Sequence, residues 1–199
     1  MSDLKLFLEP FLMLFIVFDA IGNVPIFYSL TSHMNKEERD KAFYRSVMVA
    51  SILLTVFMGA GKPLLDFYRL TLNDLRIAGG LMLLLISLTG VFGRLEANLL
   101  ISEDIAVVPM ATPLLAGPGS IYTVMYLNSV YGPIPTLISI ILNTAIAVII
   151  LRYSNALLSK LGKNLLVVMS RIMAFILAVL AVSMLREGFI NTVRSLIEK

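Results

Sequence analysis

Long apolar stretches separated by short charged segments dominate the chain. The runs Ser46–Gly61, Ile77–Gly93 and Ile105–Leu151 contain no Asp, Glu, Lys, Arg or His. A helix of roughly 17–25 apolar residues crosses the ~30 Å hydrocarbon core of a bilayer, so each run is long enough for at least one crossing. The pattern predicts six spans, which fit the gaps between charges at residues 5–32, 44–61, 75–93, 104–130, 133–152 and 165–190.

The connections between these spans are short or polar. The uncharged run 105–151 has to turn back once, and the Gly and two Pro of NSVYGPIP (128–135) predict a tight turn there. Segment 32–45 is polar and charged, and Asn35 suits the N-cap of a short surface helix over KEERD. No room remains for a separate soluble domain, so we expect one transmembrane domain over residues 1–199.

Composition supports a membrane protein. The chain is 58% hydrophobic and 15% charged, whereas soluble domains carry about 25% charged residues. Asp3 and Glu9 precede the first apolar run, and no small-x-small cleavage site follows, so we expect this run to stay in the mature chain. Cysteine is absent, which excludes disulfides and cysteine metal sites, and no basic patch suggests nucleic acid as a partner.

Spans 5–32 and 104–130 are longer than the others, and both are interrupted. Each break lies about twelve residues into its span, or ~18 Å at 1.5 Å per residue, which is near the bilayer midplane. A shift of 95 residues superposes both breaks, with the matches Gly22/Gly117, Ile26/Ile121, Ala50/Ala145, Arg76/Arg171, Ile77/Ile172 and Gly93/Gly188. Halves of about 1–95 and 96–199 then hold three spans each, and an odd number forces opposite orientations. We therefore predict an all-α membrane protein of six helices in an inverted 3+3 repeat, with helices 1 and 4 broken near the midplane.

The second break, TPLLAGPGS (112–120), has the features of an anion site. Gly117 can end one half-helix, and Pro118 suits the first position of the next. The amides of Gly119, Ser120 and Ile121 would then point into the gap with the positive end of the helix behind them, which suits a carboxylate. The bare glycines let a ligand approach the backbone closely.

The first break, FDAIGNVPIF (18–27), has the opposite character. Asp19 and the carbonyls around Ala20–Gly22 are acceptors, and Asn23 adds a donor and an acceptor. Carboxylates inside a membrane are costly and mark functional sites. A carboxylate facing an amide nest suits a small zwitterion, with its ammonium toward Asp19. The expected substrate-binding residues are Asp19, Gly22, Asn23, Pro25, Thr112, Pro113, Gly117, Pro118, Gly119 and Ser120.

Structural interpretations of the same residues stay open. A proline kink alone explains the first break, and Asp19 could be the partner of Arg76 or Arg171. Both arginines lie near span ends, where they could instead snorkel to headgroups. Tyr28 and Tyr122 are expected to pack, and the loop residue His33 has no partner pattern for a metal. Segment 104–130 fits a re-entrant hairpin as well as one broken span.

Three segments carry a family resemblance: FDAIGNVPIFYSLT, RIAGGLMLLLIS and PLLAGPGSI. They resemble the MarC/SnatA family of prokaryotic inner-membrane proteins, and the resemblance covers essentially the whole chain. SnatA-type members are described as transporters of small neutral amino acids such as glycine and alanine. The resemblance implies that function here, in the inner or plasma membrane of a prokaryote, with Asp19, Gly22, Asn23 and Pro25 and the PLLAGPGSI break at the site.

A secondary transporter working by alternating access is therefore the leading hypothesis. The coupling ion is open: Asp19 could carry a proton, or help to hold Na⁺ with exposed carbonyls. No G-x-x-x-x-G-K-[ST] motif is present to bind ATP. An exporter of other small molecules and a channel are the alternatives, and one His without Cys argues against an enzyme or a metal site. No cofactor is expected, and homo-oligomer formation is left open. Nine basic residues lie on the side of the loops between spans 1 and 2, 3 and 4, and 5 and 6, and seven lie on the opposite side. Because basic residues are more frequent on the cytoplasmic side, this difference favours both termini outside.

Overall fold

The computed structural model describes residues 3–24, 27, 30–31, 34–92, 110–112 and 115–197. It describes the backbone but not the side chains of residues 3, 4, 89, 90, 92, 155–166, 169, 170 and 196. Pro25, Tyr28, His33 and Pro113 from the sequence analysis lie outside the described residues, as do residues 104–109, on which the choice between a broken span and a re-entrant hairpin depends.

The described residues form helices joined by turns, without strands. The helices are α1 (Asp3–Phe18), α3 (Lys36–Phe67), α4 (Leu72–Phe92), α5 (Pro118–Tyr131), α6 (Pro133–Arg152) and α7 (Ser154–Ile197). Three segments of the described chain are long and apolar enough to cross a membrane: Lys36–Phe67, Pro133–Arg152 and Arg171–Ser195. The all-helical membrane class is therefore confirmed, and the span predicted at 133–152 coincides with α6.

The expectation of a short surface helix before a span at 44–61 is wrong, because one helix, α3, covers both segments. The Asn35 N-cap is confirmed: Glu38 N–H donates to Asn35 Oδ1, and Asn35 N–H donates to Glu38 Oε2, both at 3.0 Å. Residues 36–58 contain no Gly or Pro, and the buried residues Arg39, Phe43 and Val47 repeat every four positions, so the helical pattern runs through the charged segment into the apolar one.

Gly132 makes the predicted turn between α5 and α6. Its φ of 85° lies in a region that side-chain-bearing residues rarely adopt, and Pro133 begins α6 directly after it. The turn places two apolar helices next to each other within the uncharged run.

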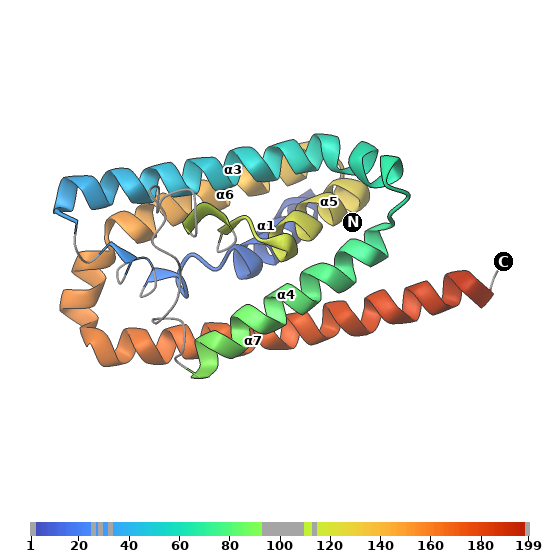
Figure 1. Cartoon of the computed structure of the whole chain (residues 1–199). Helices are drawn as coiled ribbons and strands as arrows, with labels where there is room; N and C mark the ends of the chain where they lie inside the picture. Colours follow the sequence, from blue (N-terminus) through green and yellow to red (C-terminus); the bar gives the residue numbers. More distant parts are fainter. Residues whose placement is uncertain are drawn as a thin grey trace.

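The helices form a four-helix group and a pair. α1, α3, α5 and α6 pack on one another, while α4 packs along α7 and reaches the group mainly through α5. Figure 1 shows α3 and α6 on one side, α4 and α7 on the other, and α1 and α5 between them; both termini lie at the same end. The larger hydrophobic core draws its residues from α1, the two breaks, α3, α5 and α6, whereas a second core joins α4 and α7 to Val17 and Tyr122.

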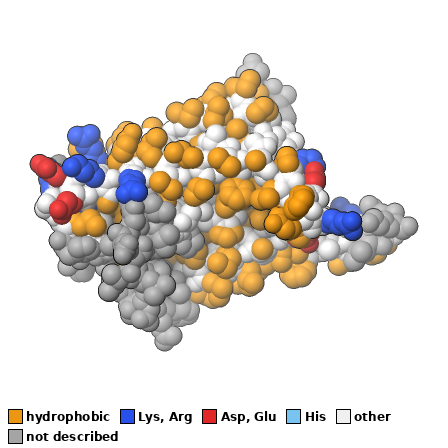
Figure 2. Space-filling model, turned by 45° about the horizontal axis from the view of Figure 1, so that its top comes forward, with side chains coloured by type: hydrophobic (Ala, Val, Ile, Leu, Met, Phe, Trp, Pro, Cys, Tyr) orange, Lys and Arg blue, Asp and Glu red, His pale blue; other side chains and the backbone are white. Residues whose placement is uncertain are grey.

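The surface matches a bilayer environment. Figure 2 shows hydrophobic side chains across the middle of the molecule, with charged side chains gathered at its two ends. Large apolar side chains are exposed along α3, α4, α6 and α7, for example Ile52, Leu85, Ile141 and Val179 at 54–58%. A contiguous apolar surface of this extent on a helical protein faces lipid.

Candidate functional site

The first break begins where α1 ends. Asp19 follows Phe18 with a φ of 44°, a left-handed conformation that Asp tolerates because its short side chain bonds locally. Its Oδ1 accepts a hydrogen bond from Gly22 N–H at 3.1 Å, and its carbonyl oxygen accepts one from Asn23 N–H at 3.1 Å. The carboxylate is thus the N-cap of the half-helix that follows, and it is only 6% exposed.

Gly22 leaves the space that the carboxylate occupies. A Cβ added at Gly22 would lie 2.6 Å from Oδ1 and 2.7 Å from Cγ of Asp19, well inside contact distance. The φ of Gly22 is not positive, so the need for glycine here comes from the neighbouring carboxylate rather than from the backbone conformation.

Asn23 compensates for part of the lost helical hydrogen bonding. Its Nδ2 donates to the carbonyl oxygen of Phe18, the last residue of α1, at 3.5 Å, and the residue is 5% exposed. The chain then resumes helical hydrogen bonds, from Phe27 N–H to Asn23 O and from Thr31 N–H to Phe27 O. The break is therefore a compact, internally bonded turn of Asp19–Asn23, within the stretch FDAIGNVPIF (18–27) expected from the sequence.

The second break has the predicted form. A wide helical turn ends at Ala116, whose N–H donates to Ala111 O at 2.8 Å, and α5 begins with Gly117 as N-cap and Pro118 as its first residue. Ser120 Oγ donates to Leu115 O at 2.8 Å, which ties the new helix to the turn before it.

The N–H group of Ile121, which was expected to face a ligand, makes a hydrogen bond within α5. Ile121 N–H donates to Gly117 O at 2.9 Å, so the expectation that it points into the gap is wrong. The amides of Gly119 and Ser120 precede this first helical bond and form the start of α5. The amide site predicted from the sequence is therefore reduced to these two residues.

The structure brings the two breaks into one buried region. Ala20 and Val24 from the first break and Leu115 and Ala116 from the second belong to the same hydrophobic core. Asp19, Asn23 and Ser120 are 6%, 5% and 2% exposed, so the polar groups of both breaks are closed off from the surface. Thr112 lies in the wide turn and is half-buried.

Helix α4 covers the N-terminus of α5. A Cβ added at Gly79 would lie 3.1 Å from the carbonyl oxygen of Pro118, and one added at Gly119 would lie 2.6 Å from Cγ of Leu83. The side chain of Leu83 therefore rests directly on the backbone of Gly119. Neither Gly79 nor Leu83 was singled out from the sequence.

Arg76 has a partner other than Asp19. Its Nη1 lies 3.0 Å from Glu187 Oε2 of α7, and its guanidinium stands over the rings of Tyr122 and Tyr126, 5.1 and 5.5 Å from their centroids. The Arg76–Asp19 alternative is therefore wrong, and Arg76 is 13% exposed at the side chain rather than extended to headgroups. Arg171 is exposed at the surface. Tyr122 packs, as expected, and also stacks on Tyr126.

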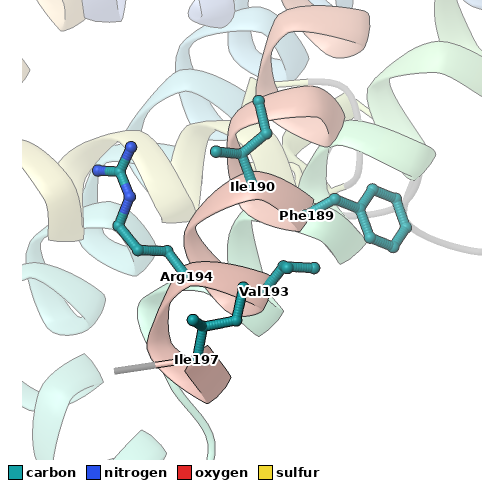
Figure 3. Close-up of a pocket in the computed structure, with 5 residues that line it drawn as sticks. All are labelled: Phe189, Ile190, Val193, Arg194 and Ile197. Carbon is teal, nitrogen blue, oxygen red and sulfur yellow. The ribbon is translucent and has the colours of Figure 1, made fainter. Parts of the chain in front are cut away.

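No cluster of three His, Asp or Glu side chains that could hold a metal ion is found where the structure describes the chain. Two apolar grooves lie away from the breaks. One, of about 430 Å³, runs beside the end of α7 between Phe189 and Ile197, with Arg194 at its edge (Figure 3). The other, of about 470 Å³, lies beside α3 between Val56 and Phe67. Each is lined by one helix, as expected for grooves filled by lipid chains.

Comparison with known proteins identifies the family. Residues 4–193 match the model of the MarC family integral membrane protein. A UPF0056 membrane protein of Methanocaldococcus jannaschii is 34% identical, covering 94% of this chain and 97% of its own length. The UPF0056 inner membrane protein YhgN of Escherichia coli is 31% identical, covering 88% of this chain and 92% of its own length. No solved structure matches the chain. With its apolar helices and two buried breaks, the chain belongs to the MarC family of integral membrane proteins.

Proposed function

We propose that the chain is a secondary active transporter of small neutral amino acids such as glycine and alanine, and that it works by alternating access. The observation that carries this proposal is a buried carboxylate in one helix break and a helix N-terminus in another, both within a single core. Broken helices at the midplane are the usual location of substrate sites in transporters.

The chemistry of the two breaks favours a zwitterion. Asp19 can hold an ammonium group, while the amides of Gly119 and Ser120 stand at the positive end of α5 and suit a carboxylate. One group of each sign favours a neutral amino acid over an anion or a cation. Asp19 and Leu83 pack closely against the backbone of Gly22 and Gly119, and such tight packing at both breaks favours a small ligand.

The arrangement of helices supports the proposed inverted repeat. α3 packs against α6 and α4 against α7, and each of these pairs is related by the 95-residue offset. Ser51 Oγ lies 2.5 Å from Thr144 Oγ1, so α3 and α6 meet close to residues that the offset makes equivalent. We propose that the chain crosses the membrane six times, in two halves of about 1–95 and 96–199, with both termini on the outer side.

Asp19 also has a structural task, since it caps the half-helix after the break. A test of its role in transport therefore needs a variant that keeps the capping hydrogen bond. Asp19→Asn retains an oxygen acceptor for Gly22 N–H but removes the charge and the ability to bind and release a proton. Asp66→Asn is the matched control, because Asp66 is 62% exposed and pairs only with Lys62 on the same helix among the described ion pairs.

The test is uptake of radiolabelled glycine and alanine into proteoliposomes under imposed proton and sodium gradients. We expect wild type and Asp66→Asn to accumulate substrate with one of the gradients, and Asp19→Asn to lose accumulation by tenfold or more while remaining folded. Accumulation by Asp19→Asn equal to wild type would limit the carboxylate to its capping task.

Other outcomes separate the alternatives. Rapid equilibration of glycine and alanine that does not depend on the proton or the sodium gradient would favour a channel. If wild type moves neither amino acid under any gradient, the substrate assignment fails, and export of another small molecule becomes the leading alternative.

A further inference from the structure

The N-terminus of α5 is closed by a helix that belongs to a different packing unit. The larger core contains no residue of α4 or α7 among the described positions, whereas Leu83 of α4 shares a core with Leu177, Ala181 and Met184 of α7. The α4–α7 pair thus packs mainly on itself, and Val17 of α1 and Tyr122 of α5 add to this second core.

Contacts within the pair are close and extend along both helices. A Cβ added at Gly80 would lie 3.0 Å from Ala181 O, and one added at Gly188 would lie 2.6 Å from Cγ1 of Ile77. Such glycines let helix backbones approach closely, which is how helices associate firmly in membranes. The Arg76–Glu187 ion pair adds a polar tie between the same two helices.

The contact between this pair and α5 is less extensive than the contact between α4 and α7. It consists of Gly79 against the Pro118 carbonyl, Leu83 on Gly119, and the guanidinium of Arg76 over Tyr122. Tyr122 also joins the second core, but the contact is smaller than the packing between α4 and α7, and a ring face accepts a cation over a range of positions. Separation at α5 therefore disrupts less packing than separation of α4 from α7.

Two of the connections of the pair, both within the described residues, are short. Residues Tyr68–Thr71 join α3 to α4, with Arg69 at a left-handed φ of 56°, and Tyr153 joins α6 to α7. Short links at the ends of packed elements are where hinge motions take place.

We propose that the α4–α7 pair moves as one body against α5, and that Leu83 is the gate residue that closes the Gly119–Ser120 amides to substrate. This inference rests on the proposed function for its role in transport. Movement of the pair away from α5 lifts Leu83 from Gly119 and exposes the start of the half-helix, and its return closes the site.

Engineered disulfides test the gate cleanly, because the natural chain has no cysteine. Leu83→Cys with Gly119→Cys locks α4 to α5, and Ile77→Cys with Gly188→Cys locks α4 to α7. The two pairs are matched, since in each a Cβ at the glycine lies 2.6 Å from a γ carbon of the aliphatic partner. The Cβ atoms are thus close enough for a disulfide, which needs about 3.5–4.5 Å between them after small adjustments.

Uptake of glycine and alanine is measured for both variants reduced, after oxidation, and after renewed reduction, with free thiols counted by maleimide labelling. We expect oxidation to lower uptake at least tenfold for the Leu83–Gly119 pair, with recovery on reduction, and to change it less than twofold for the Ile77–Gly188 pair. Undiminished uptake by the fully oxidised Leu83–Gly119 variant, or equal losses in both variants, would overturn the gate.

A second measurement does not depend on transport, so failure of the gate can be told from failure of the proposed function. Spin labels at exposed Leu81 of α4 and Val130 of α5 report the distance across the gate, and labels at Leu81 and Phe175 of α7 report the distance within the pair. We expect two populations of the first distance and one of the second in lipid. One narrow α4–α5 distance would overturn the inference, whether or not the protein moves amino acids.

Discussion

Gly22→Ala is the most direct perturbation of the first break, because the added methyl group would contact the Asp19 carboxylate. The new Cβ would lie 2.6 Å from Oδ1 and 2.7 Å from Cγ of Asp19, whereas unstrained contacts between such atoms are about 3.5 Å. Because Oδ2 of Asp19 is nearer still to the new Cβ, the carboxylate would have to move by more than about 1 Å, which breaks its 3.1 Å hydrogen bond with Gly22 N–H. Losing a bond to a charged acceptor costs about 1.5–3 kcal/mol, so we expect a destabilisation of about 2 kcal/mol.

The assay is thermal unfolding of the purified protein in detergent. Gly22→Ala should lower Tm by about 4–8 °C, using the usual 2–4 °C per kcal/mol for a chain of this size. Gly59→Ala on α3 is the control, because a Cβ there meets nothing within 4 Å and alanine favours a helix by about 0.5–1 kcal/mol. Its Tm should equal or exceed that of wild type.

A double-mutant cycle identifies the cause of the loss. In an Asp19→Ala background the carboxylate is gone, so the added methyl at position 22 has space and should cost well under 1 kcal/mol. The reasoning is refuted if Gly22→Ala leaves Tm unchanged in the natural chain, or if it costs the same with and without the Asp19 carboxylate.

Three further variants test other parts of the structure by the same unfolding assay. Arg76→Ala should lower the free energy of unfolding by about 1–3 kcal/mol, because it removes the contacts with two tyrosine rings and an ion pair. Lys62→Ala, which removes an exposed ion pair, should change it by less than about 0.5 kcal/mol. Equal effects of the two variants would contradict a stabilising role of the Arg76 contacts. Asn35→Ala should lose about 1 kcal/mol with the capping box, and Asn35→Asp should retain most of it, so identical losses would count against the cap. Gly132→Ala should cost about 1–2 kcal/mol through its φ of 85° alone, since no atom lies within 4 Å of the new Cβ, and a neutral result would exclude the left-handed turn.

Features set by neighbouring residues could be predicted from the sequence. The start of α5 at Gly117–Pro118, the Asn35 cap and the turn at Gly132 each depend on hydrogen bonds or backbone conformation within about four residues. The apolar runs likewise determine membrane residence, because transfer of a helix into lipid depends on its own composition.

Features set by distant residues could not be predicted in this way. The sequence left Asp19 open as one partner for Arg76, but Arg76 contacts Glu187, a residue more than a hundred positions away, and no local signal predicts that contact. The continuation of α3 through a charged segment was not predicted, because the segment was interpreted as a connection with a separate short surface helix, although its buried positions repeat with the helical period.

The sequence by itself determined that this chain lies in a membrane, that its helices break at two glycine-containing points, and that a carboxylate stands at the first of them. Only the tertiary structure decided that Asp19 bonds to Gly22, that both breaks share one core, and that Leu83 covers the start of α5. The physical reason is the distance along the chain over which each feature is set. Caps, breaks and hydropathy depend on neighbouring residues, whereas the contact of Leu83 with α5 depends on how whole helices pack. Glycines permit that packing without specifying the partner helix.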